Sequence, residues 1–292
     1  MFIAGIDGGG THTRIEVRDM ENQLLRRGEF GPFNINSIGE QAFHALLREV
    51  FAWCGGMADC ARLCVGAAGI SNPKVAQILA RELEATGFMG KWYLCGDQEI
   101  ALRGAMDGPG VVVIAGTGSI CFGKNEAGQT ARSGGYGHLI DDGGSGYSLG
   151  RDIFSSAVRC HDGRVVDSGI LQAVCDRLGT GPEGIVPFVY SPKTDKAAIA
   201  QFALIALEQA QQGDREALQI LRQEAGELAR MVAAVQSRLN MLHCRIALLG
   251  GLITGENPYR QAVVDTLSTL GSVVSAQRNA LWGAAQMAWE LN

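Results

Sequence analysis

The first glycine-rich segment of the chain has the residue types of a phosphate-binding turn. Gly8, Gly9 and Gly10 are consecutive, and Thr11 and Thr13 follow. A plain two-residue hairpin needs only one or two glycines. Three in succession would expose several backbone N–H groups beside two hydroxyls, and such a concave group of amides suits phosphate oxygens. We therefore expect these five residues to contact phosphate, with a plain hairpin turn as the simpler alternative.

A second segment repeats this arrangement in the other half of the chain. It reads Gly116-Thr117-Gly118-Ser119, and two facing turns of this kind could hold a triphosphate from both sides. Neither segment is a dinucleotide or P-loop fingerprint. An alternating strand, not a helix, follows the first glycines, and the pattern G-x-x-x-x-G-K-[ST] does not occur.

Asp7 directly precedes the first glycine turn. A carboxylate in this place would repel phosphate unless a cation lay between the two groups. We therefore expect Mg²⁺ near Asp7, held partly through water.

Hydrophobic periodicity predicts the elements that must position these groups. The first half begins as an antiparallel meander and continues with alternating helices and buried strands. The expected elements are strands over 2–7, 13–19 and 24–30, helical spacing over 42–51, a strand over 62–66, a helix over 73–86 and a strand over 92–95.

The second half repeats the meander and then becomes largely helical. The expected elements are strands over 111–115 and 120–124, helices dominating 145–240, a strand over 245–249 and a closing helix over 280–291. The glycine turn between two strands thus occurs twice, about a hundred residues apart, as a repeat at domain scale. A chain of 292 residues is long for one core. We expect two lobes, 1–115 and 116–292, separated by a cleft, with the last helix able to pack back on the first lobe.

The composition is that of a globular protein with a small-molecule partner. Hydrophobic residues make up 47% of the chain and charged residues 19%, the formal net charge is -5, and no stripe of Lys or Arg occurs. These features argue against nucleic-acid and membrane partners. No apolar stretch reaches the roughly 18 residues of a membrane span, and no basic leader precedes the first strand, so we expect a cytoplasmic protein. The eight cysteines form no C-x-x-C pair and are expected to be buried thiols.

Both glycine turns resemble the phosphate loops of the superfamily that contains sugar kinases, actin and the heat-shock chaperone ATPases. The matching segments are D-G-G-G-T-H-T from Asp7 and G-T-G-S from Gly116. I-A-L-L-G-G over 246–251 resembles the adenosine-binding strand and turn, which implies adenosine contacts from Gly250, Gly251 and Thr254. The resemblance covers nearly the whole chain. It implies an α/β fold of two ribonuclease H-like, actin/hexokinase-type lobes, each a mixed five-stranded sheet with flanking helices.

A third block resembles N-acetylglucosamine kinases and their BadF-type relatives. It reads G-G-Y-G-H from Gly134 and D-D-G-G-S-G-Y from Asp141. By this resemblance Asp97 is the catalytic carboxylate, and it would accept the proton of the sugar hydroxyl as the phosphoryl group moves. The implied sugar contacts are Asn34, Asp97, Ser119, Tyr136, Gly137 and Asp142.

The resemblance implies an ATP-dependent kinase, with Mg²⁺, that converts N-acetylglucosamine to its 6-phosphate by direct in-line transfer. Tyr136 replaces the usual tryptophan and Gly143 the usual glutamate. These departures leave glucosamine and N-acetylmuramic acid as alternative substrates, and a homodimer as an open possibility.

Two other classes share this fold. A BadF-type activator of a 2-hydroxyacyl-CoA dehydratase would need cysteines for an iron–sulfur cluster, but the chain has no C-A-A-G-T-G-like segment. A sugar-sensing repressor would need a DNA-binding helix pair ahead of the first strand, and the sequence begins directly with that strand.

Overall fold

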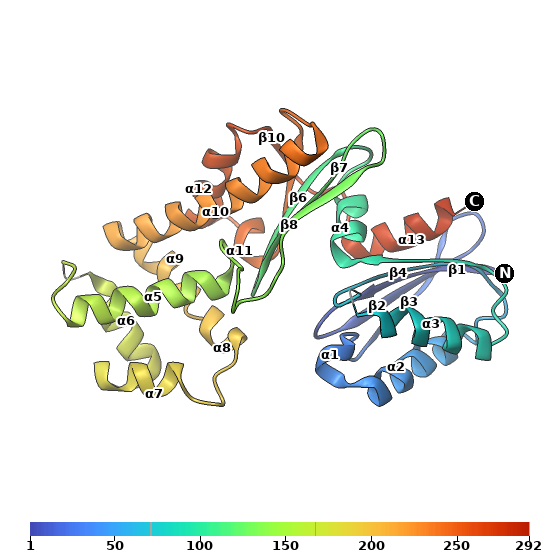
Figure 1. Ribbon diagram of the computed structural model, residues 1–292, viewed down its shortest axis with the longest axis horizontal. Coiled ribbons are helices and arrows are strands. Elements are labelled where there is room, and N and C mark those ends of the chain that lie inside the picture. The colour runs from blue at the N-terminus through green and yellow to red at the C-terminus, as the bar shows by residue number, and fades with distance from the viewer. Residues whose placement is uncertain (71, 167, 292) are drawn as a thin grey trace. The chain divides into compact units, whose positions relative to one another are not determined.

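A computed structural model describes residues 1–70, 72–166 and 168–291 and divides the chain into two units (Figure 1). The first unit contains Met1–Gly108 together with the segment that begins at Ala276, and the second is Pro109–Ser275. The division falls at Gly108 and not at Ala115, because residues 110–115 form the central strand of the second sheet. The closing helix belongs to the first unit, although the whole second unit precedes it in the chain.

The first unit is built on a five-stranded mixed sheet of order β3-β2-β1-β4-β5. Its strands are β1 (Phe2–Gly8), β2 (Thr13–Arg18), β3 (Leu24–Phe30), β4 (Cys60–Ala67) and β5 (Lys91–Gly96). The first three strands pair antiparallel, whereas β4 pairs parallel with β1 and β5 pairs parallel with β4. This mixed sheet confirms the architecture expected for the first half.

Helices cover both faces of this sheet (Figure 1). They are α1 (Ile35–Ile38), α2 (Glu40–Trp53), α3 (Pro73–Ala85), α4 (Asp97–Ala105) and α13 (Ala280–Glu290). The core with α2 and α3 contains Leu63 and Val65, while the alternate residue Cys64 packs with α4 and α13 on the other face. At Gly5 the backbone of α13 lies so close that a Cβ atom would be 2.2 Å from the nitrogen of Ala285. This close approach explains a glycine inside a buried strand.

The second unit repeats the same strand topology, in the order β10-β9-β6-β7-β8. Its strands are β6 (Gly110–Ala115), β7 (Ser119–Lys124), β8 (Thr130–Gly134), β9 (Arg245–Leu249) and β10 (Ser272–Val274). β6, β7 and β8 form an antiparallel meander, and β9 and β10 add parallel strands. The domain-scale repeat expected from the two glycine turns is therefore present in the fold.

The remaining residues of the second unit are mainly helical. The helices are α5 (Gly146–His161), α6 (Gly169–Leu178), α7 (Ile185–Val189), α8 (Lys196–Ala200), α9 (Ala203–Gln211), α10 (Arg215–Leu239), α11 (Gly251–Thr254) and α12 (Pro258–Leu267), with a 3₁₀ turn at Pro182–Gly184. The long helix α10 begins where the Asp214 side chain accepts a hydrogen bond from the Ala217 N–H, and it ends at Asn240 in a left-handed conformation. Its apolar face packs against β7 and β8 in the largest core cluster.

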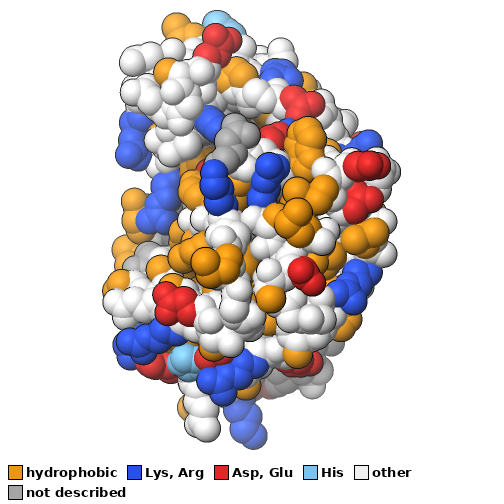
Figure 2. All heavy atoms as spheres, turned by 90° about the vertical axis from the view of Figure 1, so that its right-hand side faces the viewer, with side chains coloured by type: hydrophobic (Ala, Val, Ile, Leu, Met, Phe, Trp, Pro, Cys, Tyr) orange, Lys and Arg blue, Asp and Glu red, His pale blue; other side chains and the backbone are white. Residues whose placement is uncertain are grey.

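The surface carries both signs of charge. On the face drawn in Figure 2, basic and acidic side chains are interspersed with hydrophobic and uncharged ones. No helix in the part of the chain that the structure describes is both long and apolar enough to cross a bilayer.

Two helical glycines give a matched test of the packing of α13 on α4. In Gly283→Ala the new Cβ would lie 2.0 Å from the carbonyl oxygen of Ile100, so we expect overpacking to lower the free energy of unfolding by about 1–3 kcal/mol. In Gly226→Ala, within α10, the new Cβ meets nothing within 4 Å, and the higher helix propensity of alanine should raise stability by up to about 1 kcal/mol. Thermal unfolding of both variants measures the difference. Shifts of the same sign in the two proteins would contradict the close contact between the helices.

Candidate active site

In the first unit, polar groups gather where three parallel strands end. The register aligns Asp7 of β1 with Gly66 of β4, and Gly66 with Cys95 of β5. Asp97 follows β5 directly and is the first residue of α4. Asp7 and Asp97 thus lie at the same edge of the sheet, the carboxyl edge at which open α/β sheets bind their ligands.

Both carboxyl groups have raised pKa values, and Asp97 contributes to the rise at Asp7. Burial raises the pKa of Asp7 to about 6, and repulsion from Asp97 adds to the rise, while Arg14 opposes it. Burial also raises the pKa of Asp97, against the effect of the Gln98 N–H, which donates to its Oδ1 at 3.0 Å. A cation near Asp7 would stabilise the ionised forms of both groups, so the residues present fit Mg²⁺. Among the described residues no three or more acidic, His or Cys side chains gather, and a Mg²⁺ ion here would take its other ligands from water and phosphate.

The first glycine turn is held by hydrogen bonds from neighbouring loops. The Gly9 N–H donates to the His12 carbonyl, the Gly9 carbonyl accepts from the Phe33 N–H, and the Gly8 carbonyl accepts from the Ala68 N–H. Gly10 and Thr11 form the exposed tip of the turn. With its base held in this way, the turn can present these two residues to a ligand.

Thr13 has a different place from the one expected. Its side chain is fully buried, and its hydroxyl donates to the Gly31 carbonyl at 2.7 Å. The expectation that this hydroxyl faces phosphate therefore needs correction. Thr13 holds the loop after β3 against the first glycine turn, because it is the first residue of β2 and points inward.

Asn34 lies beside the first glycine turn, one residue after Phe33. Its Oδ1 accepts from the Asn36 N–H at 3.0 Å and caps α1. A Cβ at Gly69, in the loop after β4, would be 2.9 Å from the same oxygen. The Asn34 amide nitrogen makes no hydrogen bond to the protein within residues 1–70, 72–166 and 168–291, so it can donate to a ligand.

In the second unit, the second glycine turn is bonded to the start of α5. The carbonyls of Gly116 and Thr117 accept from the N–H groups of Gly146 and Tyr147 at 2.8 and 3.2 Å, and the Gly116 N–H donates to Gly118. Gly146 and Tyr147 are the first residues of a 16-residue helix. The positive end of the α5 dipole therefore lies at this turn, where it favours anions.

Asp142 is buried in a constrained backbone conformation beside the second glycine turn. It is 3% exposed and adopts a left-handed backbone with φ of 71°. Its Oδ1 accepts a long hydrogen bond of 3.5 Å from the Ser119 N–H, and its Oδ2 has no partner in the described parts of the chain. A Cβ at Gly118 would lie 3.1 Å from Oδ2, so this oxygen lies against the second glycine turn. Backbone strain together with a buried, unpaired oxygen is characteristic of a position that receives a ligand.

Ser119 serves to hold this arrangement. It is buried, and its hydroxyl donates to the Gly143 carbonyl at 2.6 Å. Its expected role as a direct sugar contact is therefore corrected to that of a residue that fixes the chain next to Asp142.

Two residues that were not predicted from the sequence hold the backbone at Gly144, two residues after Asp142. The Glu224 carboxylate of α10 accepts from the Gly144 N–H at 2.5 Å, and the Tyr259 hydroxyl of α12 donates to the Gly144 carbonyl at 2.7 Å. Gly144 has φ of 81°. Burial, with repulsion from Asp152 as a smaller cause, raises the pKa of Glu224 to about 7. A glutamate on the buried face of α10 indicates a buried polar contact. Its partner Gly144 lies 80 positions away in the sequence, so the contact could not be predicted from local patterns.

The expected adenosine turn lies beside the end of β6. Gly250 has φ of 96°, and a Cβ there would be 2.2 Å from the Ala115 carbonyl. Gly251 begins α11, and the Thr254 hydroxyl donates to the Gly250 carbonyl at 3.0 Å. The structure thus brings the Gly250 turn next to the residue that precedes Gly116.

Tyr136 and Gly137 form an exposed turn after β8. Tyr136 is 58% exposed, and the guanidinium carbon of Arg132 lies 5.0 Å from the centre of its ring. Gly137 has φ of 90°, and its carbonyl accepts from the N–H groups of Ile140 and Asp141. The ring is therefore accessible to a ligand on the side away from Arg132.

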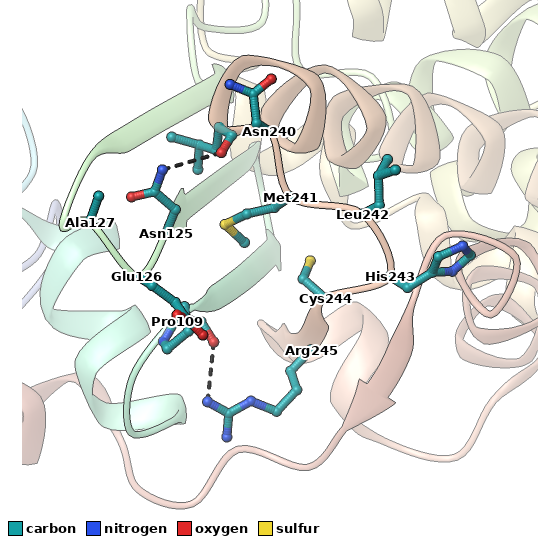
Figure 3. A pocket seen from close by; sticks show the side chains of 11 residues that line it. Pro109, Asn125, Glu126, Ala127, Asn240, Met241, Leu242, His243, Cys244 and Arg245 are labelled. Carbon is teal, nitrogen blue, oxygen red and sulfur yellow. Dashed lines mark hydrogen bonds between the residues drawn. The ribbon is translucent and has the colours of Figure 1, made fainter.

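A cavity of about 600 Å³ lies at the end of the second sheet opposite the second glycine turn (Figure 3). It is lined by Pro109, the β7–β8 turn and the loop over 239–245. Pro109 and the loop over 239–245 lead into the parallel strands β6 and β9, and the β7–β8 turn lies at the same end because Lys124 pairs with Gly110. The turns at Gly116 and Gly250 follow β6 and β9 at the opposite end. With roughly 3.3 Å per residue, the length of β6 separates the cavity from the second glycine turn. The cavity therefore plays no part in the candidate site.

Two sheets of the same strand order, each with a glycine turn after its first strand, define the class of nucleotide-binding proteins that includes sugar kinases. Within that class, the chain belongs to the BadF/BadG/BcrA/BcrD ATPase family, whose family model matches residues 4–288.

Several relatives of known description match most of the chain. N-acetylmuramic acid/N-acetylglucosamine kinase of Clostridium acetobutylicum is 32% identical over 88% of this chain and 87% of its own. N-acetyl-D-glucosamine kinase of Dictyostelium discoideum is 30% identical over 81% of this chain and 80% of its own. A solved structure from Chromobacterium violaceum, provisionally named an N-acetylglucosamine kinase, superposes with a TM-score of 0.76 at 26% identity and covers 98% of both chains.

The buried Glu224 carboxyl gives a pH-dependent prediction. Its folded-state pKa of about 7 lies above the ordinary value of 4.5, so the folded protein binds the extra proton between these values. Its contribution to stability is therefore most favourable at low pH and is lost as pH rises through 7. Glu224→Gln keeps an acceptor for the Gly144 N–H but removes the charge. We expect its melting temperature relative to the wild type to be higher at pH 8 than at pH 5.

The matched control is Glu227→Gln, three residues further along α10, where the side chain is 45% exposed and pairs with Arg230. Its melting temperature relative to the wild type should show little change with pH. A flat pH dependence for Glu224→Gln as well would contradict the assignment of a buried, titrating carboxyl at this position.

Proposed function

We propose that the protein is an ATP-dependent amino-sugar kinase that phosphorylates N-acetylglucosamine at its 6-hydroxyl. The observation that supports this most directly is Asp97, a carboxyl group of raised pKa at the carboxyl edge of a parallel sheet, beside Asp7 and the first glycine turn. Kinship with amino-sugar kinases agrees with this reading.

In the proposed reaction Asp97 and the two glycine turns have separate roles. Asp97 accepts the proton of the sugar hydroxyl, because an alcohol is a poor nucleophile and a positioned carboxylate activates it. The tip of the first glycine turn and the second glycine turn, at the positive end of α5, donate to the phosphate oxygens as charge develops on them. Asp7 would help to hold Mg²⁺, directly or through water, and the ion would supply positive charge to neutralise the phosphates. Because ATP is the donor, we expect the reaction in the cytoplasm.

The sugar contacts in this proposal are Asn34, Tyr136, Gly137 and Asp142. In the described parts of the chain the Asn34 amide nitrogen and the Asp142 Oδ2 have no partner, and Tyr136 has an exposed ring. Gly250, Gly251 and Thr254 remain the proposed adenosine contacts. N-acetylmuramic acid is the second candidate substrate, because the Clostridium relative is named for both sugars.

A substrate screen tests the proposal. ADP release is measured with N-acetylglucosamine, N-acetylmuramic acid, glucosamine and glucose, each with and without Mg²⁺. We expect ADP release that depends on an N-acetylated amino sugar. ATP hydrolysis unaffected by any sugar would favour the electron-transfer activator class instead.

Asp97→Asn tests the general base. The variant keeps the shape of the side chain, so it should fold and bind both substrates while kcat falls by about 10² to 10⁴, the usual contribution of a positioned base. The matched control is Glu99→Gln in the same turn of α4, where the carboxylate accepts only from the Tyr93 hydroxyl in the described structure. Steady-state kinetics on the best sugar compares the two. A kcat for Asp97→Asn close to that of the control would remove Asp97 from the mechanism.

Gly118→Val tests the second glycine turn. The new Cβ would lie 3.1 Å from Asp142 Oδ2, and its methyl groups would extend further towards the turn. We expect nucleotide affinity to be lost while the far-ultraviolet circular dichroism remains that of the wild type. Calorimetry measures the affinity of the variant for ATP. An unchanged ATP affinity in the folded variant would refute the phosphate-binding role of this turn.

A further inference from the structure

A second, smaller cavity of about 240 Å³ lies within the second unit, next to the sugar block. Side chains from three places line it: the segment after Tyr136, helix α5, and the loop that leads into α8. The lining residues that matter here are His138, Tyr147, Arg151, Phe154, Lys196 and Ile199.

This cavity is continuous with the residues of the candidate site. His138 lies two residues after Tyr136 and packs edge-on against Tyr147, with ring centres 4.8 Å apart. The backbone N–H of Tyr147 donates to the carbonyl of Thr117 in the second glycine turn. One wall of the cavity is thus fixed to the turn that is proposed to hold phosphate.

The lining of the cavity has an excess of positive charge. Arg151 pairs with Asp152 at 3.0 Å and also donates to Ser148. Asp195, the acidic residue of the lining, accepts from the Ala198 N–H at 2.8 Å and caps α8. Lys196 makes no ion pair with any residue that the structure describes. Arg151 and Lys196 outnumber Asp195 in the lining, so an anion would be favoured here.

Buried apolar residues complete the lining. Phe154 and Ile199 are each 6% exposed. Pockets that enclose a whole drug-sized ligand measure roughly 300–1,000 Å³, so this cavity suits one substituent and not an entire sugar or nucleotide. A substituent with both an alkyl group and a carboxylate matches the apolar and basic parts of the lining together.

We propose that this cavity receives an ether-linked, carboxylate-bearing substituent of the amino-sugar substrate, such as the lactyl group of N-acetylmuramic acid. The methyl group packs on Phe154 and Ile199, and the carboxylate pairs with Lys196 and Arg151. This inference rests on the proposed kinase activity and specifies which amino sugars the same site accepts. A bare phosphate would leave the apolar residues without a partner, which favours the carboxylate.

Lys196→Gln is the test, because Lys196 is exposed and its side chain holds no other part of the fold. Loss of one charge-assisted contact should lower kcat/KM for N-acetylmuramic acid by about 10-fold, mainly through KM. The values for N-acetylglucosamine, which has no carboxylate, and the KM for ATP should stay within about twofold. Lys193→Gln, an equal change of charge three residues earlier and outside the cavity lining, is the matched control and should leave all three values unchanged.

Calorimetric binding of N-acetylmuramic acid at low and high salt provides a readout independent of turnover. The wild type should lose affinity with salt, and Lys196→Gln should show a smaller loss.

Equal decreases in kcat/KM for both sugars in the variant, or a raised KM for ATP alone, would assign the cavity to general sugar or nucleotide binding and overturn the proposal. Phosphorylation of N-acetylglucosamine without binding of N-acetylmuramic acid would overturn it while leaving the kinase function intact. Absence of phosphorylation of any sugar would count against the kinase function itself, and the calorimetry would still decide whether the cavity recognises the carboxylate.

Discussion

The parallel alignment of β1, β4 and β5, and of β6, β9 and β10, determines where the chemistry of this protein lies. Parallel strands end on the same side of a sheet, so residues that follow them in the sequence become neighbours in space. In the first unit this places Asp7 beside Asp97, and in the second it places Gly250 beside the start of the second glycine turn. The antiparallel hairpins contribute the glycine turns themselves. The site groups of each unit are therefore a consequence of strand direction.

Close backbone approach is the second constraint. The Gly250 turn can lie on Ala115 only because glycine carries no side chain, and the bond between Gly146 and Gly116 depends on similar proximity. Around Asp142 the fold accepts a left-handed aspartate and an unpaired oxygen, and it holds them with Ser119, Glu224 and Tyr259. A rigid support for a strained residue is what a binding site requires, since the free energy of that strain has to be offset by contacts elsewhere.

The parts of the fold that could be predicted from sequence are those with local signals. The meanders, the glycine turns and the position of Asp97 after β5 follow from alternation and turn residues close in sequence. The return of α13 to the first unit was expected, but its packing partner β1 could not be identified from local signals, because β1 lies at the other end of the sequence. For Thr13 and Ser119 the residue type was informative, but the direction of the hydroxyl depends on loops at Gly31 and Gly143. Glu224 and Tyr259 were missed for the same reason, since both act through Gly144.

The packing of α13 on β1 has a consequence for how the protein is made. Ribosomal synthesis produces the first sheet early, yet the backbone of Ala285 that covers Gly5 appears only after the entire second unit has been translated. Until then α4 alone can cover the face of the sheet that carries Cys64 and Cys95, and the apolar surface that α13 will bury stays exposed. The second unit, continuous in sequence, faces no such delay. The order of translation therefore allows the second unit to mature before the first.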